Sequence, residues 1–224
     1  MRLILGLDLG QSQDHSALCG VERVRLALPI YRRKFRYVVR LLDEFPLGVS
    51  YPDQIKRVVK TLEHPALKNS RMAVDYTGVG RPVFDLLKDA RPPSILYPVL
   101  TTSGHNVTYD PKTREIHAPK TEQVSLLQVL LEADLINWHP KLSAAGRLKD
   151  QLSRFRVKIT KAKNQTFGAE SGTNDDLVSS LMLACFLGEQ VGDANPMGIG
   201  LPSEGERSVV DSSPDGVFQT GREV

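Results

Sequence analysis

Short apolar runs along this chain alternate with longer segments in which apolar residues recur every three or four positions. The first run, residues 3–7, is apolar except for Gly6, which is typical of a short strand buried on both faces. Further strands are predicted at 15–28, 37–45, 71–75 and 94–100. Because short turns join the first three of these five strands, we expect them to form an antiparallel meander.

Helical spacing of apolar residues predicts the remaining elements. The expected helices are 51–64, 81–90, 119–134, 142–154 and 177–187. Shorter segments at 106–109, 114–117 and 135–139 are candidates for small additional strands. Three strands followed by strand–helix units predict an α/β fold, with a mixed five-stranded sheet and helices on both faces.

Charge is distributed unevenly between the body of the chain and its end. The whole chain has a net charge of +3, but residues 189–224 hold seven acids and two bases among many Gly, Pro and Ser residues. Residues 1–188 are therefore predicted to form one domain, and 189–224 a flexible acidic tail. A basic body favours a polyanionic partner.

Several classes of protein are disfavoured by composition. The chain has no apolar stretch of about 18 residues, so we expect no membrane span, and its N-terminus lacks the pattern of a secretion signal. Cys19 and Cys185 both lie in apolar segments without the spacing of a metal site, and they are expected to be small core residues. These features favour a reducing, cytoplasmic location.

Acids stand at three places where a buried element begins or ends. Asp8 lies near the end of the first strand, Asp75 ends the fourth, and Asp175 and Asp176 precede the last helix. A buried strand does not tolerate an unpaired charge. On its own, Asp8 is compatible with a metal ligand, a nucleotide-binding loop, a partner of a buried cation, or an Asp that caps its own turn.

The topology brings these acids together. The first and fourth strands are expected to be parallel neighbours, and the last helix can place its N-terminus at their carboxyl ends, where α/β folds hold their sites. Carboxylates gathered there repel one another unless cations lie between them. Ligand sets made only of oxygen favour magnesium or manganese, and two such ions can cleave a phosphodiester.

Three segments resemble the acidic motifs of a known family. They are GLDLGQSQDHSA (6–17), AVDYTGVG (73–80) and NDDLVSSL (174–181). Together, in this order, they resemble the nuclease domain of tailed-phage large terminase subunits, and Pro119-Lys120 before a long helix is also similar. That domain is RNase H-like and related to the RuvC resolvases, so the resemblance, which covers residues 1–188, implies an RNase H-like fold.

The resemblance also implies an activity and a role for each acid. It implies an endodeoxyribonuclease that uses two Mg²⁺ or Mn²⁺ ions to cut concatemeric viral DNA during packaging, in the host cytoplasm, with little sequence specificity. Asp8 would bridge the two ions, Asp75 would hold one, and Asp176, with Asp175 beside it, would supply the third ligand. Some relatives have an acid where this chain has Ser179.

Partners follow from the same resemblance. They are double-stranded DNA, a terminase ATPase domain, the small terminase subunit and the portal. The sequence contains no G-x-x-x-x-G-K-[ST] motif, so the packaging ATPase is not expected within these residues.

Basic residues outside the acidic motifs are candidates for binding the DNA backbone. They are Lys120, Arg32, Arg33 and Lys34, and Lys158, Lys161 and Lys163 in the basic region that begins at Arg147. Among other polar residues, His15 is the histidine best placed to reach the site, and Asp14 adjoins it.

Two other functions fit parts of the sequence. The segment around Asp8 also resembles the phosphate loop of the actin and sugar-kinase superfamily, which would make the chain an ATP-binding phosphotransferase. The chain is short for two such lobes and has no Gly-Gly adenosine motif near its end. The second alternative is a catalytically inactive RNase H-like module that binds DNA or a protein partner.

Overall fold

The computed structural model describes residues 3–10, 14–30, 33–78, 80–104, 106–162 and 175–190, with side chains to residue 155 in the fifth range. The strands are β1 (Leu3–Asp8), β2 (Ala17–Ile30), β3 (Arg33–Glu44), β4 (Arg71–Asp75), β5 (Ile95–Thr102), β6 (Thr108–Tyr109), β7 (Ile116–Pro119) and β8 (Ile136–Trp138). The helices are α1 (Tyr51–Leu62), α2 (Gly80–Asp89), α3 (Lys120–Glu132), α4 (Ala145–Ala162) and α5 (Asp176–Gln190), and a short 3₁₀ helix covers Pro65–Leu67.

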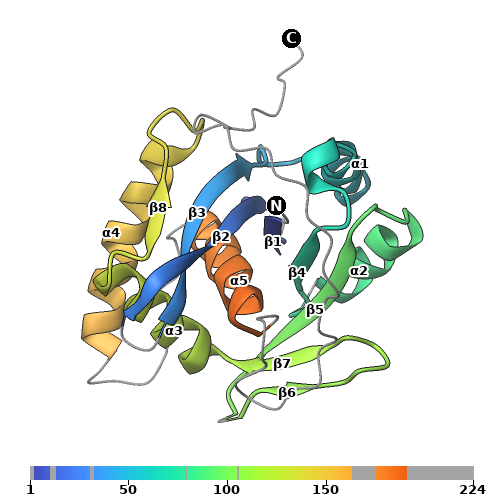
Figure 1. Cartoon of the computed structure of the whole chain (residues 1–224). Coiled ribbons are helices and arrows are strands. Elements are labelled where there is room, and N and C mark those ends of the chain that lie inside the picture. Colours follow the sequence, from blue (N-terminus) through green and yellow to red (C-terminus); the bar gives the residue numbers. More distant parts are fainter. Residues whose placement is uncertain are drawn as a thin grey trace.

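All eight described strands belong to one mixed sheet, in the order β6-β7-β5-β4-β1-β2-β3-β8 (Figure 1). The predicted meander is confirmed, since β2 pairs antiparallel with both β1 and β3. The predicted parallel pairing of β1 with β4 is also confirmed. The expected number of five strands was too low, because the short segments β6, β7 and β8 extend the same sheet at its two edges rather than remaining as loops.

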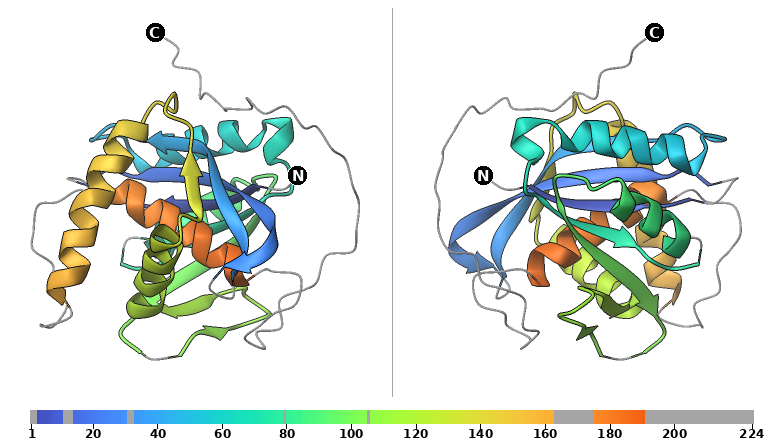
Figure 2. Two further views of the ribbon diagram at one scale, coloured as in Figure 1. Left: turned by 60° about the vertical axis from the view of Figure 1, so that its left-hand side comes forward. Right: turned by 90° about the vertical axis from the view of Figure 1, so that its right-hand side faces the viewer.

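Helices cover both faces of this sheet, as predicted (Figure 2). Along β1 the side chains alternate: Leu3, Leu5 and Leu7 pack in a core cluster with α1 and α2, whereas Ile4 packs with α3, α4 and α5. We call these two sides the α1 face and the α5 face.

Helix α5 crosses the middle of the sheet (Figure 1), and nearly all of its residues are buried. It lies close to β1 because Gly6 has no side chain: a Cβ added there would stand 2.0 Å from the Ser180 carbonyl oxygen and 2.6 Å from the Ala184 nitrogen. The free cysteines Cys19 and Cys185 are both buried in the core of the α5 face, as predicted.

The far end of α5 is fixed to the β2–β3 hairpin. Arg23 Nη1 donates to the Gly188 carbonyl oxygen at 2.6 Å, and Tyr37 Oη and Arg33 Nη1 donate to the Glu189 carboxylate at 2.7 and 2.8 Å. Glu189, which the sequence assigns to the tail, is therefore part of α5. The rest of the predicted tail, 191–224, lies outside the described residues.

Helix α4 is longer than its pattern predicts. It continues to Ala162 instead of ending near Arg154, so it contains Lys158 and Lys161. No helix among the described residues has the length and apolar character needed to cross a membrane.

Candidate metal centre

Asp8 and Asp75 lie side by side at the carboxyl edge of the sheet. The parallel register pairs Leu7 with Val74, so the next residues of β1 and β4 are Asp8 and Asp75, on strands spaced about 4.8 Å apart. Each acid comes two positions after a residue on the α5 face, Gly6 and Ala73 respectively, so both carboxyl groups belong to that face. The sequence prediction that these two acids meet is confirmed in position.

The N-terminus of α5 supplies the third and fourth acids. Asp175 accepts a hydrogen bond from Ser179 N at 2.8 Å through its backbone carbonyl, which begins the helix. The side-chain oxygen Oε1 of Gln151, on α4, accepts from the backbone N–H groups of Leu177 at 3.0 Å and Val178 at 3.3 Å. This buried glutamine therefore satisfies two free amides of the first turn and fixes the helix start beside the sheet.

The electrostatics show that the four acids form one cluster. The pKa of Asp8 is raised well above its usual value, first by removal from water and then by the negative charges of Asp75, Asp176 and Asp175. Burial likewise raises the pKa of Asp176 to about 6, and the charge of Asp175 adds to this effect.

The pKa of Asp75 is subject to opposing influences. Its removal from water raises the pKa, but the Thr77 backbone N–H donates to Asp75 Oδ1 at 2.9 Å and a side-chain hydrogen bond joins it to Asp8, and both contacts lower the pKa. Without a cation, both neighbouring carboxyl groups therefore have a raised pKa.

The residues fit a hydrated divalent cation. Asp176 is only 6% exposed, yet its Oδ2 atom has no hydrogen-bond partner in the structure. All donors in the cluster are carboxylate oxygens, which suit magnesium and manganese. No three His, Cys, Asp or Glu side chains of the described residues already surround a single point. Magnesium commonly uses one or two carboxylates and keeps several waters, so the cluster does not need a closed cage.

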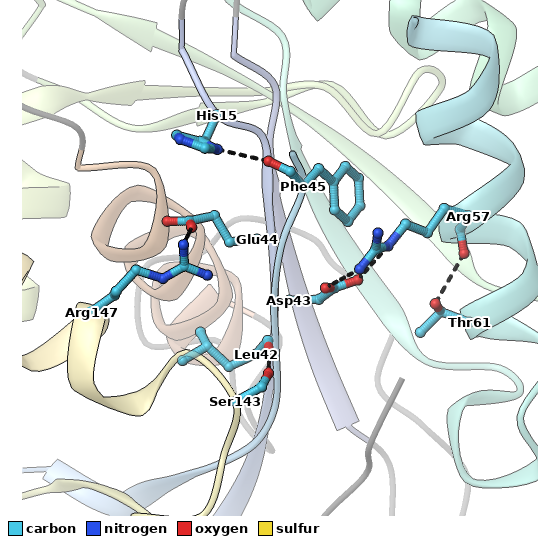
Figure 3. Close-up of polar contacts among 9 residues, drawn as sticks. All are labelled: His15, Leu42, Asp43, Glu44, Phe45, Arg57, Thr61, Ser143 and Arg147. Carbon is cyan, nitrogen blue, oxygen red and sulfur yellow. Dashed lines mark hydrogen bonds and ion pairs between the residues drawn. The ribbon is translucent and has the colours of Figure 1, made fainter. Parts of the chain in front are cut away.

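Three polar residues that the sequence analysis names as candidates lie near this cluster. Lys120, the first residue of α3, lowers the pKa of both Asp8 and Asp75, so its charge is close to the acids. The charge of His15 lowers the pKa of Asp176, and that of Asp14 raises it. His15 Nδ1 lies 2.8 Å from the Phe45 carbonyl oxygen, a contact that requires the proton on Nδ1 and leaves Nε2 available (Figure 3).

Two other predicted DNA-binding residues, Arg33 and Lys34, are not brought to the acids. Arg33 and Lys34 begin β3, roughly 35 Å along the strand from its acidic end at Glu44. Arg33 forms an ion pair with Glu189 at 2.8 Å, whereas Lys34 is exposed. Arg32 and Lys163 lie outside the described residues, and the side chains of Lys158 and Lys161 are not described, so their roles remain predictions.

Two residues near the cluster were missed by the sequence interpretation, Gln151 and Glu44. The Glu44 side chain is 3% exposed and forms an ion pair with Arg147 of α4 (Figure 3). A local signal for Glu44 did exist, because it lies one residue before the end of the predicted strand 37–45, as Asp8 lies near the end of its own strand. No local pattern marks Gln151, whose partners are 26 and 27 residues away.

Comparison with known proteins supports the fold. No family model matches this chain, and no curated protein is similar enough in sequence to match. The large terminase nuclease from thermophilic phage G20c aligns with 82% of this chain and 80% of its own, with a TM-score of 0.51 and 19% identity. The large terminase nuclease domain of bacteriophage SPP1, with bound Mn, aligns with 84% of this chain and 87% of its own, with a TM-score of 0.50 and 15% identity.

Likeness at this level of identity concerns the fold. The chain has the RNase H-like α/β fold predicted from its sequence, in the form found in large terminase nuclease domains.

Proposed function

We propose that this protein is a metal-dependent endodeoxyribonuclease that cuts double-stranded DNA with little sequence specificity. The observation that carries the proposal is the cluster of Asp8, Asp75, Asp175 and Asp176, with a buried, unpartnered carboxylate oxygen, at the carboxyl edge of the sheet. The SPP1 domain, which shares the fold, has manganese bound. This supports a divalent ion here.

Each acid has a distinct task in this proposal. Asp8 is the acid whose pKa is affected by all three of the others, so it would bridge two ions, with Asp75 holding one and Asp176, assisted by Asp175, holding the other. When bound, such ions lower the pKa of an attacking water and stabilise the leaving oxygen of a phosphodiester. Lys120 would bind a phosphate from the edge of the cluster, since its charge already acts on Asp8 and Asp75.

The biological setting is proposed from the same likeness. We assign the enzyme to the cutting of concatemeric viral DNA during packaging, in the host cytoplasm, with a terminase ATPase domain, a small terminase subunit and a portal as partners. The phosphotransferase alternative is less well supported, because every described strand belongs to one sheet and the acidic helix start has no role in nucleotide binding.

Nicking of supercoiled plasmid tests this function. We expect the protein to convert plasmid to nicked and linear forms with magnesium or manganese, but not with calcium or with a chelator. Asp8→Ala should abolish the reaction. Asp85→Ala, which removes an exposed acid on α2, is the matched control and should cut normally. Metal-dependent cutting by Asp8→Ala at the wild-type rate would refute the proposal, and absence of cutting by the wild type would favour an inactive DNA-binding module.

A further inference from the structure

Two consecutive acids at the end of β3 each bind an arginine, on opposite faces of the sheet (Figure 3). Asp43 faces α1, where Arg57 donates to both of its carboxylate oxygens, from Nε at 2.9 Å and from Nη2 at 2.5 Å. Glu44 faces α4 and α5, where Arg147 Nη1 pairs with its Oε2 atom. Both acids are almost fully buried, with side-chain exposures of 5% and 3%.

Glu44 shares a row of the sheet with the acid cluster. Asp8 pairs with Ala17 on β2, and Ala17 pairs with Glu44 on β3, so these three residues lie on one line across the α5 face. Two strand spacings place Glu44 about 10 Å from Asp8. This separation is too large for the two acids to hold the same ion, but it is small enough for a group at Glu44 to reach DNA bound at Asp8.

Arg147 is fixed beside the start of α5. It precedes Gln151 by four residues, so both side chains lie on one face of α4, one turn apart. Gln151 binds the first amides of α5, next to Asp176, and Arg147 binds Glu44. Glu44 therefore holds the guanidinium, and the helix that carries it is joined to the start of α5 one turn further along.

The side chain of Arg147 is more exposed to solvent than that of Arg57, the arginine of the other ion pair. Its side chain is 56% exposed, compared with 38% for Arg57, and the ion pair with Glu44 uses one terminal nitrogen, Nη1. A guanidinium has five N–H donors in a rigid planar fork that matches the oxygens of a phosphate. Because the contact with the buried Glu44 carboxylate involves Nη1 and more than half of the side chain is exposed, the Arg147 guanidinium retains donors for a further anion.

We propose that Arg147 binds a backbone phosphate of the DNA, adjacent to the phosphate that is cut, and that Glu44 is its positioning residue. The assignment rests on the proposed nuclease function. The Asp43–Arg57 pair, on the face away from the acids, has only a structural role. The two pairs therefore differ in function although they belong to consecutive residues of one strand.

Charge-neutral double variants separate these roles. Glu44→Gln with Arg147→Gln, and Asp43→Asn with Arg57→Gln as the matched control, each remove one positive and one negative charge, so the net charge of +3 is unchanged. Neither leaves a buried ion without its partner. The affinity for a short fluorescent DNA duplex is measured by anisotropy in calcium, over a range of salt concentrations, with the duplex checked to be intact.

We expect the Glu44/Arg147 variant to bind DNA roughly fivefold to tenfold more weakly. Its slope of log affinity against log salt should be smaller by about 0.9, because one phosphate contact is lost. The Asp43/Arg57 variant should retain the wild-type affinity and slope. A purely structural ion pair would lower the melting temperature without changing the slope.

The possible failures are distinguishable. If the wild type nicks plasmid through Asp8 but the Glu44/Arg147 variant binds with wild-type affinity and slope, the inference is overturned and the nuclease function stands. If the wild type neither binds nor cuts DNA, both are overturned. If both double variants reduce the slope of log affinity against log salt by the same amount, the effect is not specific to the α5 face and the inference fails. Arg147→Lys, which keeps the charge but lacks the fork, should retain the salt slope and bind with intermediate affinity.

Discussion

Asp43 on the α1 face and the acid cluster on the α5 face are compensated in opposite ways at the same edge of the sheet. On the α1 face, Asp43 has its own arginine, and the pair is hydrogen-bonded through both carboxylate oxygens. On the α5 face, the charges that most affect Asp8 are those of three other acids, and they raise its pKa. The negative charge of Asp43 is thus neutralised by an arginine of the protein. The acid cluster on the α5 face keeps a surplus of negative charge, which a cation from solvent can neutralise.

This contrast separates stability from function. A paired acid such as Asp43 stabilises the fold, and its removal leaves Arg57 without its partner. A cluster of like charges destabilises the metal-free fold and is useful only for what it binds. Substitutions matched across the two faces should therefore give opposite results for activity and for stability.

The largest difference is expected from exchanging one acid on each face for its amide. Asp75→Asn should lower metal-dependent plasmid cleavage by more than about 100-fold, because a ligand matters more than the outer contacts whose loss costs 10–100-fold. Its melting temperature without metal should stay the same or rise, since repulsion with Asp8 is relieved.

Asp43→Asn should show the reverse pattern. Cleavage should remain within about twofold of the wild type, while the free energy of unfolding falls by about 2 kcal/mol. This loss is below the range for fully buried pairs because Arg57 is 38% exposed. Gel-based cleavage and urea denaturation of both variants provide the test. Equal losses of activity in the two variants would show that the faces do not differ as described.

Two glycines on adjacent strands extend the comparison to packing. Gly6 faces the backbone of α5, where an added Cβ would stand 2.0 Å from the Ser180 carbonyl oxygen. Gly20 faces leucine side chains of the α1 face instead, with Leu5 Cδ2 at 2.9 Å and Leu41 Cβ at 3.0 Å. Helix backbone cannot yield as a flexible side-chain end can, so the α5 face is the less tolerant of the two.

Gly6→Ala is therefore expected to reduce the free energy of unfolding by more than about 3 kcal/mol, and Gly20→Ala by about 1 kcal/mol. Gly6→Ala should also impair cleavage, because moving α5 away from β1 separates Asp176 from Asp8. Urea denaturation measures the first effect, and plasmid nicking below the melting temperature measures the second. Comparable stability losses in the two variants would contradict the assignment of the close contact to α5.

Much of this site could be predicted because its signals are local. The buried run before Asp8, the short strand before Asp75 and the small-residue helix after Asp176 each identify an element and its end. Parallel pairing of β1 with β4 then follows from simple topology. What the sequence could not predict depends on contacts between distant residues.

Glu44 illustrates the limit. The face of β3 on which it lies depends on register, and its partner Arg147 is on α4, far along the chain. The additional strands were uncertain for a similar reason, since β6 has two residues and β8 has three, too few to show a period. Arg33 was predicted to bind DNA, but its partner Glu189 was assigned to a tail rather than to α5.

A further effect concerns pH and follows from Asp176. Folding raises the pKa of this carboxyl from 3.8 to about 6, so the folded chain binds its proton more tightly than the unfolded chain. Stability from this group is fully present below pH 4 and is lost as the pH rises through about 6. A change of two in pKa corresponds to at most about 3 kcal/mol. Asp8 and Asp75, whose pKa values are also raised, act in the same direction.

The metal-free wild type and Asp176→Asn should therefore have similar stabilities near pH 4, and the variant should be the more stable near pH 7.5. Urea denaturation in the presence of a chelator, from pH 4 to pH 7.5, measures the difference in stability between the two proteins. Groups that titrate in the same way in both proteins do not contribute to this difference. Manganese at pH 7.5 should raise the melting temperature of the wild type by mass action, but not that of Asp176→Asn. If the two stability curves run parallel with pH, Asp176 is not held in a strained, charged state. The surplus negative charge of the α5 face would then reside on Asp8 and Asp75 alone, with the start of α5 a structural element rather than a ligand.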